Sequence, residues 1–292
     1  FGSLIRGFLD QRKKREEMKR KYPPKPGAKP WAFFNTFRRG MQDLPNGMAD
    51  AVGRERIITG IAATIIERSA DGWRVTLENG DIIEGDALII ATEAWTATRL
   101  VRDVDESIAG LLGEIPCSSS ATVSMAFRSE DCPFDVKWFG ILSPVVEDRP
   151  LLAVTLSSSK WPDRAPEGRV LLRGFIGGPQ NQHLLDAPDE ELVETIRQQL
   201  VELLKVRPEA TPIFTRVFRW NGGMPQYTIG HLDRVDEIER KTGEISGFGL
   251  AGGAFRGVGI PNCIESGERA VDKVLGDLGV TYVEETAPPR GR

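Results

Sequence analysis

Two segments of the chain place their apolar residues at the spacing of an amphipathic helix. Residues 189–206 begin with acidic side chains, which interact favourably with the N-terminal end of a helix dipole, and a second pattern runs from Ile264 to Leu278. Both patterns predict a helix with one buried face. The apolar positions are Leu192, Ile196, Leu200, Leu203 and Leu204 in the first segment, and Ile264, Val271, Val274, Leu275 and Leu278 in the second.

From about residue 31 to 108 the apolar and polar positions alternate, which predicts strands. Trp73, Val75 and Leu77 share one face of such a strand. The sequence ENGD at Glu78–Asp81 is typical of a hairpin turn. Residues 87–91 are apolar throughout and predict a short buried strand.

Between about residues 109 and 225 the strand-like runs predict a mixed sheet. These runs are 123–127, 151–156 and 170–176. The first 30 residues have a helical pattern, which Pro23 and the prolines after it end, because proline lacks a backbone N–H and clashes with the preceding turn.

A glycine-rich stretch precedes the helix predicted from Ile264 onward. Six glycines fall within 13 residues: Gly247, Gly249, Gly252, Gly253, Gly257 and Gly259. Glycine permits positive φ angles and lets the backbone approach a ligand closely. The following helix offers unpaired N–H groups and the positive end of its dipole, which favour an anionic or electron-rich ligand. A strand-to-helix turn without a ligand would need only one or two glycines.

Two nucleotide-binding motifs resemble this stretch in their glycine spacing, but the other features that each motif requires are missing. GFGLAG at Gly247–Gly252 has the form GxGxxG, but a dinucleotide fingerprint needs a strand before its first glycine and a helix at its last. Here the polar residues 239–246 precede it. Gly252 and Gly257 have P-loop spacing, yet Val258 and Gly259 stand where Lys and Ser or Thr belong. We reject both motifs.

Four blocks of sequence carry a resemblance to a known family. They are LAGGAFRGVGIPNCIESGERA at 250–270, RWNGGMPQYTIGH at 219–231, GMQDLPNGMADAV at 40–52 and FGILSP at 139–144. In this order they resemble the oxygen-dependent protoporphyrinogen and coproporphyrinogen oxidases of the flavin amine oxidase superfamily. The PQY–GH block (Pro225-Gln226-Tyr227 with Gly230-His231) together with the glycine block is specific to this tetrapyrrole branch. The 40–52 block alone indicates only the superfamily.

The resemblance implies an α/β fold in which an FAD-binding, Rossmann-like domain carries an inserted mixed-sheet substrate domain and part of a helical region. No strand–GxGxxG–helix is found ahead of these blocks. We therefore interpret the chain as the C-terminal portion of a longer flavoprotein and expect it, as given, not to retain FAD. The implied divisions are 1–30, the end of a helical, membrane-facing region and a linker; 31–108, the middle of the FAD-binding domain; 109–225, the substrate-binding domain; 226–280, the C-terminal segment of the FAD-binding domain; and 281–292, a tail.

The resemblance also implies site residues, position by position. The cofactor-binding residues would be Ala63, whose backbone would contact the adenine, Trp220, Gly252, Val258, Gly259 and Ile260. The residues lining the tetrapyrrole site would be Phe139, Gly140 and Leu142. A core role for Trp220 and an edge-strand packing role for the 139–142 cluster stay open. No catalytic side chain is implied, and neither paired carboxylates nor a pocket histidine emerges from the sequence; Tyr227 and Gln226 are not assigned as a general base.

The implied reaction is the oxidation of protoporphyrinogen IX or coproporphyrinogen III to the porphyrin by dioxygen, with release of hydrogen peroxide, in haem synthesis. The two substrates differ only in propionate or vinyl groups at two positions, and the sequence does not separate them. The alternatives are another flavin amine oxidase relative, such as an amine oxidase or desaturase, and a truncated fragment without catalytic activity. The PQY–GH block argues against the first.

The distribution of charge along the chain indicates which kinds of binding partner are compatible with the sequence. The net charge is −4, but Arg6–Lys29 holds ten basic and three acidic residues, a local +7 that leaves −11 for the rest. This basic segment indicates a solvated helix face or peripheral contact with anionic lipid. Aromatic residues are not interleaved with its basic residues, as they are in segments that stack on nucleic acid. No apolar run is long enough to span a bilayer. The odd number of cysteines indicates a reducing compartment, and we expect a cytoplasmic protein, peripheral on the membrane's inner face if the lipid alternative holds. A homodimer stays open.

The cysteine and histidine content predicts neither a metal site nor a disulfide framework. Cys117, Cys132 and Cys263 are an odd number without CxxC spacing, and His183 and His231 are the two histidines. Cys263 follows the glycine stretch and is interpreted as a small packed residue rather than a redox group.

Overall fold

The computed structural model describes residues 4–21, 35–134 and 138–281. The chain divides into two units, residues 1–54 and 55–292. In the first unit, α1 spans Leu4–Lys21 and α2 spans Asp43–Val52. Helix α1 agrees with the helix predicted ahead of Pro23. Helix α2 lies in a region predicted to be extended, and that prediction is wrong there.

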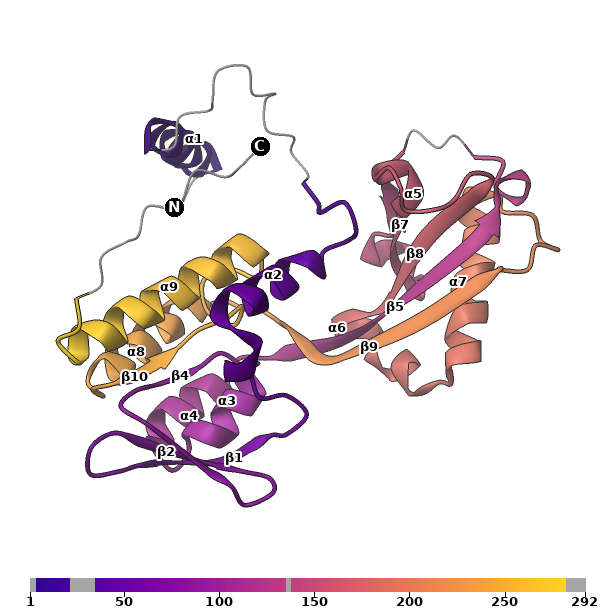
Figure 1. Ribbon diagram of the computed structural model, residues 1–292. Coiled ribbons are helices and arrows are strands. Elements are labelled where there is room, and N and C mark those ends of the chain that lie inside the picture. The colour runs from indigo at the N-terminus through magenta and orange to yellow at the C-terminus, as the bar shows by residue number, and fades with distance from the viewer. Residues whose placement is uncertain (1–3, 22–34, 135–137, 282–292) are drawn as a thin grey trace. The chain divides into compact units, whose positions relative to one another are not determined.

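The second unit contains a five-stranded sheet with the strand order β6-β7-β8-β5-β9 (Figure 1). Each pairing in it is antiparallel, whereas the sequence predicted a mixed sheet. The predicted run at 151–156 coincides with β7, and the run at 170–176 lies within β8. The strands are β5 (Cys117–Arg128), β6 (Gly140–Leu142), β7 (Leu151–Leu156), β8 (Arg169–Gly177) and β9 (Phe214–Pro225).

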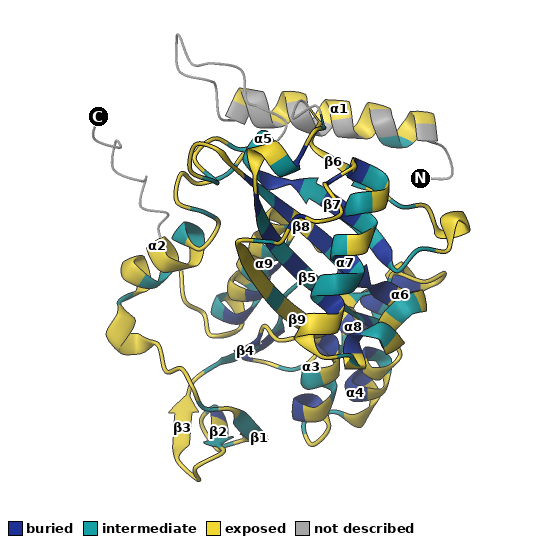
Figure 2. Ribbon diagram, turned by 90° about the vertical axis from the view of Figure 1, so that its right-hand side faces the viewer, coloured by how far each residue is buried: buried dark blue, intermediate teal, exposed yellow. Residues whose placement is uncertain are grey.

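Helix α7 (Asp189–Leu204) covers one face of this sheet, where the amphipathic pattern placed it. Its residues Leu192, Ile196 and Leu200 are buried against alternate residues of β5, β7 and β8. Packing is tight at Gly174, where an added Cβ would lie 2.5 Å from a methyl carbon of Ile196. Figure 2 shows buried positions along β5, β7 and β8, while β9 is mostly exposed.

A second hydrophobic core lies among smaller elements of the same unit. Trp73 and Phe248 meet at its centre with ring centroids 5.2 Å apart. An antiparallel sheet has the order β1-β2-β3, with β1 at Ala63–Arg68, β2 at Trp73–Leu77 and β3 at Ile82–Gly85, and the predicted ENGD turn joins the last two. A parallel pair is formed by β4 (Leu88–Ile90) and β10 (Phe248–Leu250).

Three helices complete this core: α3 (Ala94–Val101), α4 (Glu106–Gly113) and α8 (His231–Gly243). Helix α9 (Ile260–Asp277) packs on β10, where a Cβ added to Gly249 would lie 3.3 Å from a methyl carbon of Val274. Helix α9 agrees with the predicted C-terminal helix, while α3, α4 and α8 were not predicted. Short turns of helix occur at α5 (Ser157–Lys160), α6 (Gly178–Asn181), Arg54–Arg56, Ser129–Asp131, Val145–Glu147 and Gln182–Asp186.

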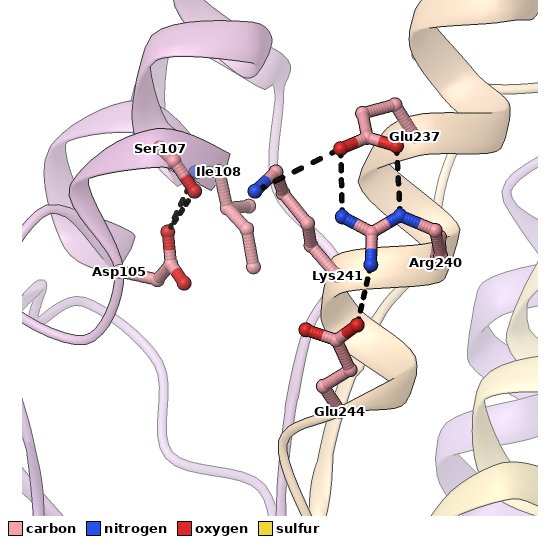
Figure 3. A network of polar contacts seen from close by, with 7 residues as sticks. All are labelled: Asp105, Ser107, Ile108, Glu237, Arg240, Lys241 and Glu244. Atoms are coloured by element: carbon pink, nitrogen blue, oxygen red, sulfur yellow. Dashed lines mark hydrogen bonds and ion pairs between the residues drawn. The ribbon is translucent and has the colours of Figure 1, made fainter.

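Polar contacts hold the ends of α4 and α8 in place (Figure 3). The Asp105 carboxylate caps α4 by accepting hydrogen bonds from the Ser107 hydroxyl at 2.5 Å and the Ile108 N–H at 2.9 Å. These two hydrogen bonds stabilise the charged form and lower the pKa of Asp105. On α8, Arg240 binds Glu237 and Glu244, and the resulting hydrogen bonds lower the pKa of Glu237.

Candidate functional site

The site is built at the carboxyl ends of the parallel strands β4 and β10. Ligands of parallel α/β sheets bind at this edge, because the loops that leave the strands converge there. Strand β10 is followed by the loop 251–259, which leads directly into α9. The backbone of this loop approaches the turn after β4, since a Cβ added to Gly252 would lie 3.8 Å from the Thr92 carbonyl oxygen.

Glycines are required in this loop for two different reasons. Gly252 and Gly257 have φ angles of 126° and 154°, which side chains rarely adopt. Gly259 has an ordinary φ of −72°, so its backbone tolerates other residues. However, a Cβ at Gly259 would lie 2.9 Å from Asn262 Oδ1, and one at Gly257 would lie 2.6 Å from Asn262 Cγ. The Asn262 side chain therefore fills the space beside both glycines.

The N-terminus of α9 faces this loop without a side-chain cap. Gly259 is the N-cap residue, no side chain bonds the first turn, and Pro261 occupies a first-turn position where a missing N–H costs little. Among the described residues, the hydrogen bonds outside helices and strands do not use the N–H groups of Val258 and Gly259. Val258 and Ile260 are also about half exposed. The loop thus combines free backbone donors, a helix dipole and apolar side chains.

The loop is attached to the segment 227–239 by two hydrogen bonds to its backbone carbonyls and by the ion pairs of Arg256, which belongs to the loop. Tyr227 Oη donates to the Gly253 carbonyl at 2.6 Å, and His231 Nε2 lies 2.7 Å from the Phe255 carbonyl. Since a carbonyl only accepts, His231 carries its proton on Nε2. Arg256 pairs with Asp236 and Glu239 of α8 at 2.5 and 2.6 Å. These contacts fix the loop to the segment that begins with the PQY–GH block.

Tyr227 and His231 also support each other. Their rings stack with centroids 4.0 Å apart and an interplanar angle of 11°. Burial raises the pKa of the Tyr227 phenol, so it stays protonated and able to donate at neutral pH. Within the described residues His231 Nδ1 is buried without a hydrogen-bond partner. The two side chains therefore have a structural role, which is to hold the Gly253 and Phe255 carbonyls of the loop in place.

Strand β9 links this site to the five-stranded sheet. The Gly222 N–H donates to the Ser119 hydroxyl at 2.9 Å, and Gln226 donates to the Ser118 hydroxyl at 2.9 Å. Gly222 has a φ of 59°, and a Cβ there would lie 2.9 Å from the indole nitrogen of Trp95. Trp95 belongs to the first turn of α3, so the turn after β4 contacts β9 as well as approaching the glycine loop.

The expected site residues fall into three groups. Gly252, Val258, Gly259 and Ile260 lie together in the glycine loop and at the start of α9. Trp220 lies on β9, 55% exposed, with its ring centroid 6.5 Å from that of Phe218. Ala63 begins β1, where it pairs with Leu77 and packs against the second core. In the described part of the chain, no hydrogen bond or strand pairing joins Ala63 to the loop.

Phe139, Gly140 and Leu142 lie at the far edge of the five-stranded sheet. Phe139 directly precedes β6, and its carbonyl accepts a hydrogen bond from the Leu156 N–H. Gly140 has a packing reason to be glycine, because a Cβ would lie 2.1 Å from the Val154 carbonyl oxygen. Phe139 is 57% and Leu142 81% exposed. Among the described residues, neither side chain belongs to one of the two hydrophobic cores.

Several residues that shape the site were not assigned by sequence reasoning. Asn262 lies beside two glycines of the loop, Arg256 of the loop pairs with α8, and Trp95 lies beside Gly222 of β9. These roles depend on contacts made after folding. Tyr227 and His231 were recognised as part of a block, but their contacts with the glycine loop were not foreseen. The sequence signal for these contacts was that the PQY–GH block and the glycine block occur together in one chain.

A separate cavity of about 250 Å³ lies between α8, α9 and β10. Its lining includes Ile238, Thr242, Gly249 and Arg269, and it does not include Val258, Gly259 or Ile260. This volume is below that of a typical ligand pocket. Among the described residues there is no cluster of His, Cys, Asp and Glu suited to a metal ion, and no helix has the length and apolarity to cross a membrane.

Comparison with known proteins identifies the family. The model of the family "Flavin containing amine oxidoreductase" matches residues 3–275. The chain is 31% identical to coproporphyrinogen III oxidase of Propionibacterium freudenreichii subsp. freudenreichii, over 86% of the chain and 46% of that protein. It is 28% identical to coproporphyrinogen III oxidase of Bacillus subtilis (strain 168), over 85% of the chain and 52% of that protein, and 29% identical to protoporphyrinogen oxidase 1, chloroplastic, of Arabidopsis thaliana, over 90% and 51%.

Solved structures agree. A protein from Exiguobacterium sp. 255-15, provisionally described as a protoporphyrinogen oxidase, superposes with a TM-score of 0.72 at 26% identity, over 86% of this chain and 54% of that one. Cyclohexylamine oxidase from Brevibacterium oxydans shares the fold with a TM-score of 0.65 at 17% identity, over 82% and 53%. The chain thus spans about half the length of these relatives. It belongs to the flavin containing amine oxidoreductase family.

Proposed function

We propose that this chain forms the substrate-binding part and the C-terminal flavin-binding part of an FAD-dependent porphyrinogen oxidase of haem synthesis. The observation that carries the proposal is the attachment of the PQY–GH block to the glycine loop through Tyr227 and His231. This block marks the tetrapyrrole branch of the family, and the three relatives compared above are named as coproporphyrinogen or protoporphyrinogen oxidases.

The glycine loop fits a flavin. Free N–H groups at Val258 and Gly259 and the dipole of α9 would stabilise negative charge, such as that on a reduced isoalloxazine. The exposed side chains of Val258 and Ile260 offer apolar contacts to a flat ring. When bound, the flavin supplies a two-electron acceptor. We assign the remaining FAD contacts to Gly252, Trp220 and the backbone of Ala63, so that residues 31–108 and 226–280 serve the cofactor.

The five-stranded sheet, residues 109–225, serves the substrate in this proposal. Phe139 and Leu142 expose apolar side chains, as a large and mostly apolar macrocycle requires of its binding site. Their role is to orient the ring, since holding reactants in register is a large part of rate acceleration. Conversion of a porphyrinogen to a porphyrin removes six electrons and six hydrogens. Three molecules of dioxygen would accept them, giving three molecules of hydrogen peroxide.

No side chain of the described site is assigned as a base. Tyr227 donates its proton to a backbone carbonyl. His231 uses Nε2 for another carbonyl, and its unpaired Nδ1 is buried, since the residue is only 3% exposed, so it does not face a substrate. The proposal includes a cytoplasmic location, with peripheral membrane contact through the basic segment between Arg6 and Lys29.

The test uses the complete flavoprotein reconstituted with FAD. Coproporphyrinogen III, protoporphyrinogen IX and a set of primary and cyclic amines are supplied separately in air. We expect porphyrin fluorescence to rise with one or both porphyrinogens, together with three hydrogen peroxide molecules per porphyrin above the autoxidation blank. Turnover of the amines without turnover of either porphyrinogen would contradict the proposal.

A further inference from the structure

The face of the five-stranded sheet that points away from α7 carries a repeating pattern of side chains. Residues paired across antiparallel strands share a face, so the register fixes its membership. One row runs Ala153, Phe175, Thr122 and Phe218, and the next runs Thr155, Arg173, Ser124 and Arg216. We call this surface, with Trp220, Leu142, Leu171, Ala126 and Phe214 beside the two rows, the open face.

Two arginines of the open face are free to bind a ligand. Arg173 on β8 and Arg216 on β9 both pair with Ser124 of β5, so they flank one serine in the same row. Two strand spacings put their Cα atoms roughly 10 Å apart. Both side chains are exposed, and in the described part of the chain no ion pair joins either of them to a carboxylate. By contrast, Arg219 on the opposite face binds Asp189 and the carbonyls of Leu185 and Ala187.

An apolar row lies directly beside these arginines. Phe218 is 49% and Trp220 55% exposed, which is high for aromatic side chains in a strand. The Arg216 guanidinium lies 5.6 Å from the centroid of the Phe218 ring. The strand positions named for the open face include no Asp or Glu. The surface therefore suits a flat, apolar ring that bears carboxylates.

We propose that Arg173 and Arg216 bind propionate carboxylates of the porphyrinogen, with the ring lying on the row that contains Phe175 and Phe218. This inference rests on the proposed function and adds the residues that select the substrate. Arginine binds carboxylates through paired, charge-assisted hydrogen bonds. A ring with four propionates supplies acidic groups to this row in more orientations than a ring with two propionates and two vinyl groups. The arginine pair accordingly favours coproporphyrinogen III over protoporphyrinogen IX.

The test measures binding of the two fluorescent porphyrins, coproporphyrin III and protoporphyrin IX, to the purified protein by fluorescence titration. The variants are Arg173→Gln, Arg216→Gln and the double variant. Arg169→Gln is the matched control, because Arg169 lies on the same strand and face as Arg173 but beyond both rows. Far-ultraviolet circular dichroism and the melting temperature check that each variant is folded.

We expect the protein to bind coproporphyrin III about tenfold more tightly than protoporphyrin IX. Each arginine variant should lose about five- to tenfold of the affinity for coproporphyrin III, because a charge-assisted hydrogen bond is weakened by solvent at an exposed side chain. The double variant should bind the two porphyrins equally, and Arg169→Gln should change neither affinity by more than about twofold.

Three outcomes overturn the inference in different ways. Binding of both porphyrins without any effect of the arginine variants would refute the arginine assignment and leave the tetrapyrrole function standing. An equal loss in Arg169→Gln would show a general charge effect of the surface rather than a site. Absence of binding by either porphyrin would contradict both this inference and the proposed function.

Discussion

At the scale of single residues, the glycine loop shows that a glycine with an ordinary φ can still be crowded by a neighbouring side chain. Gly259 has φ −72°, an ordinary value, yet a Cβ there would lie 2.9 Å from Asn262 Oδ1. The ordinary φ means that a larger residue at position 259 is not forced into a disfavoured backbone geometry. The Asn262 side chain, which lies beside the added Cβ, must move instead.

Gly259→Val should therefore push Asn262 aside, displace the loop and weaken flavin binding in the complete flavoprotein by about five- to a hundredfold, which corresponds to roughly 1–3 kcal/mol for an overpacked contact. Flavin content after gel filtration measures this effect. Gly267→Val is the matched control, because a Cβ at Gly267 in α9 meets no atom within 4 Å. Equal flavin content in the Gly259→Val variant and the wild type would show that the loop does not hold the cofactor.

At the scale of elements, polar side chains at helix ends fix the helices that cover the second core. The Asp105 carboxylate accepts two hydrogen bonds at the start of α4, and its pKa is lowered because those bonds favour the charged form. Such a group contributes stability that is present above its unfolded pKa of about 3.9 and is lost as the pH falls through its folded pKa.

Asp105→Ala should lower the free energy of unfolding by about 1 kcal/mol at pH 7, as loss of an N-cap does. The difference from the wild type should shrink as the pH falls below about 4, because the wild-type carboxylate is then protonated. Urea unfolding at pH 7 and at pH 3 measures both effects, provided the protein is folded at the lower pH in the absence of urea. Asp103→Ala, which removes a nearby acid that is not the cap, is the control. A difference that stays constant with pH would contradict the assigned role of the charge.

At the scale of the whole molecule, sequence patterns predicted the helices and strands that have one regular apolar face. They did not predict the elements whose structure depends on contacts with distant parts of the chain. Helix α7 and strands β7 and β8 agree with the prediction, since strict apolar periodicity marks an element with one buried face. Helix α8 was missed because its sequence is mostly charged and only a few positions, such as Val235 and Ile238, are buried. Strand β9 was not among the predicted runs, and the glycines in its second half do not favour a strand.

The site shows the same division. The glycine loop could be found from sequence, because glycine density and a following helix are local features. The contacts of Tyr227 and His231 with the loop carbonyls join residues more than 20 positions apart, and no periodicity reports them. The open face likewise depends on strand order and register, which bring Arg173 and Arg216 into one row.

The central claim is that the flavin lies against the glycine loop and the N-terminus of α9. Hydrogen–deuterium exchange of the complete flavoprotein, with and without FAD and read by mass spectrometry at peptide resolution, tests it most directly. We predict that FAD slows exchange in peptides that cover residues 252–262, because the N–H groups of Val258 and Gly259 gain an acceptor and the loop becomes less accessible. Unchanged exchange in these peptides, with protection confined to other parts of the chain, would contradict the account.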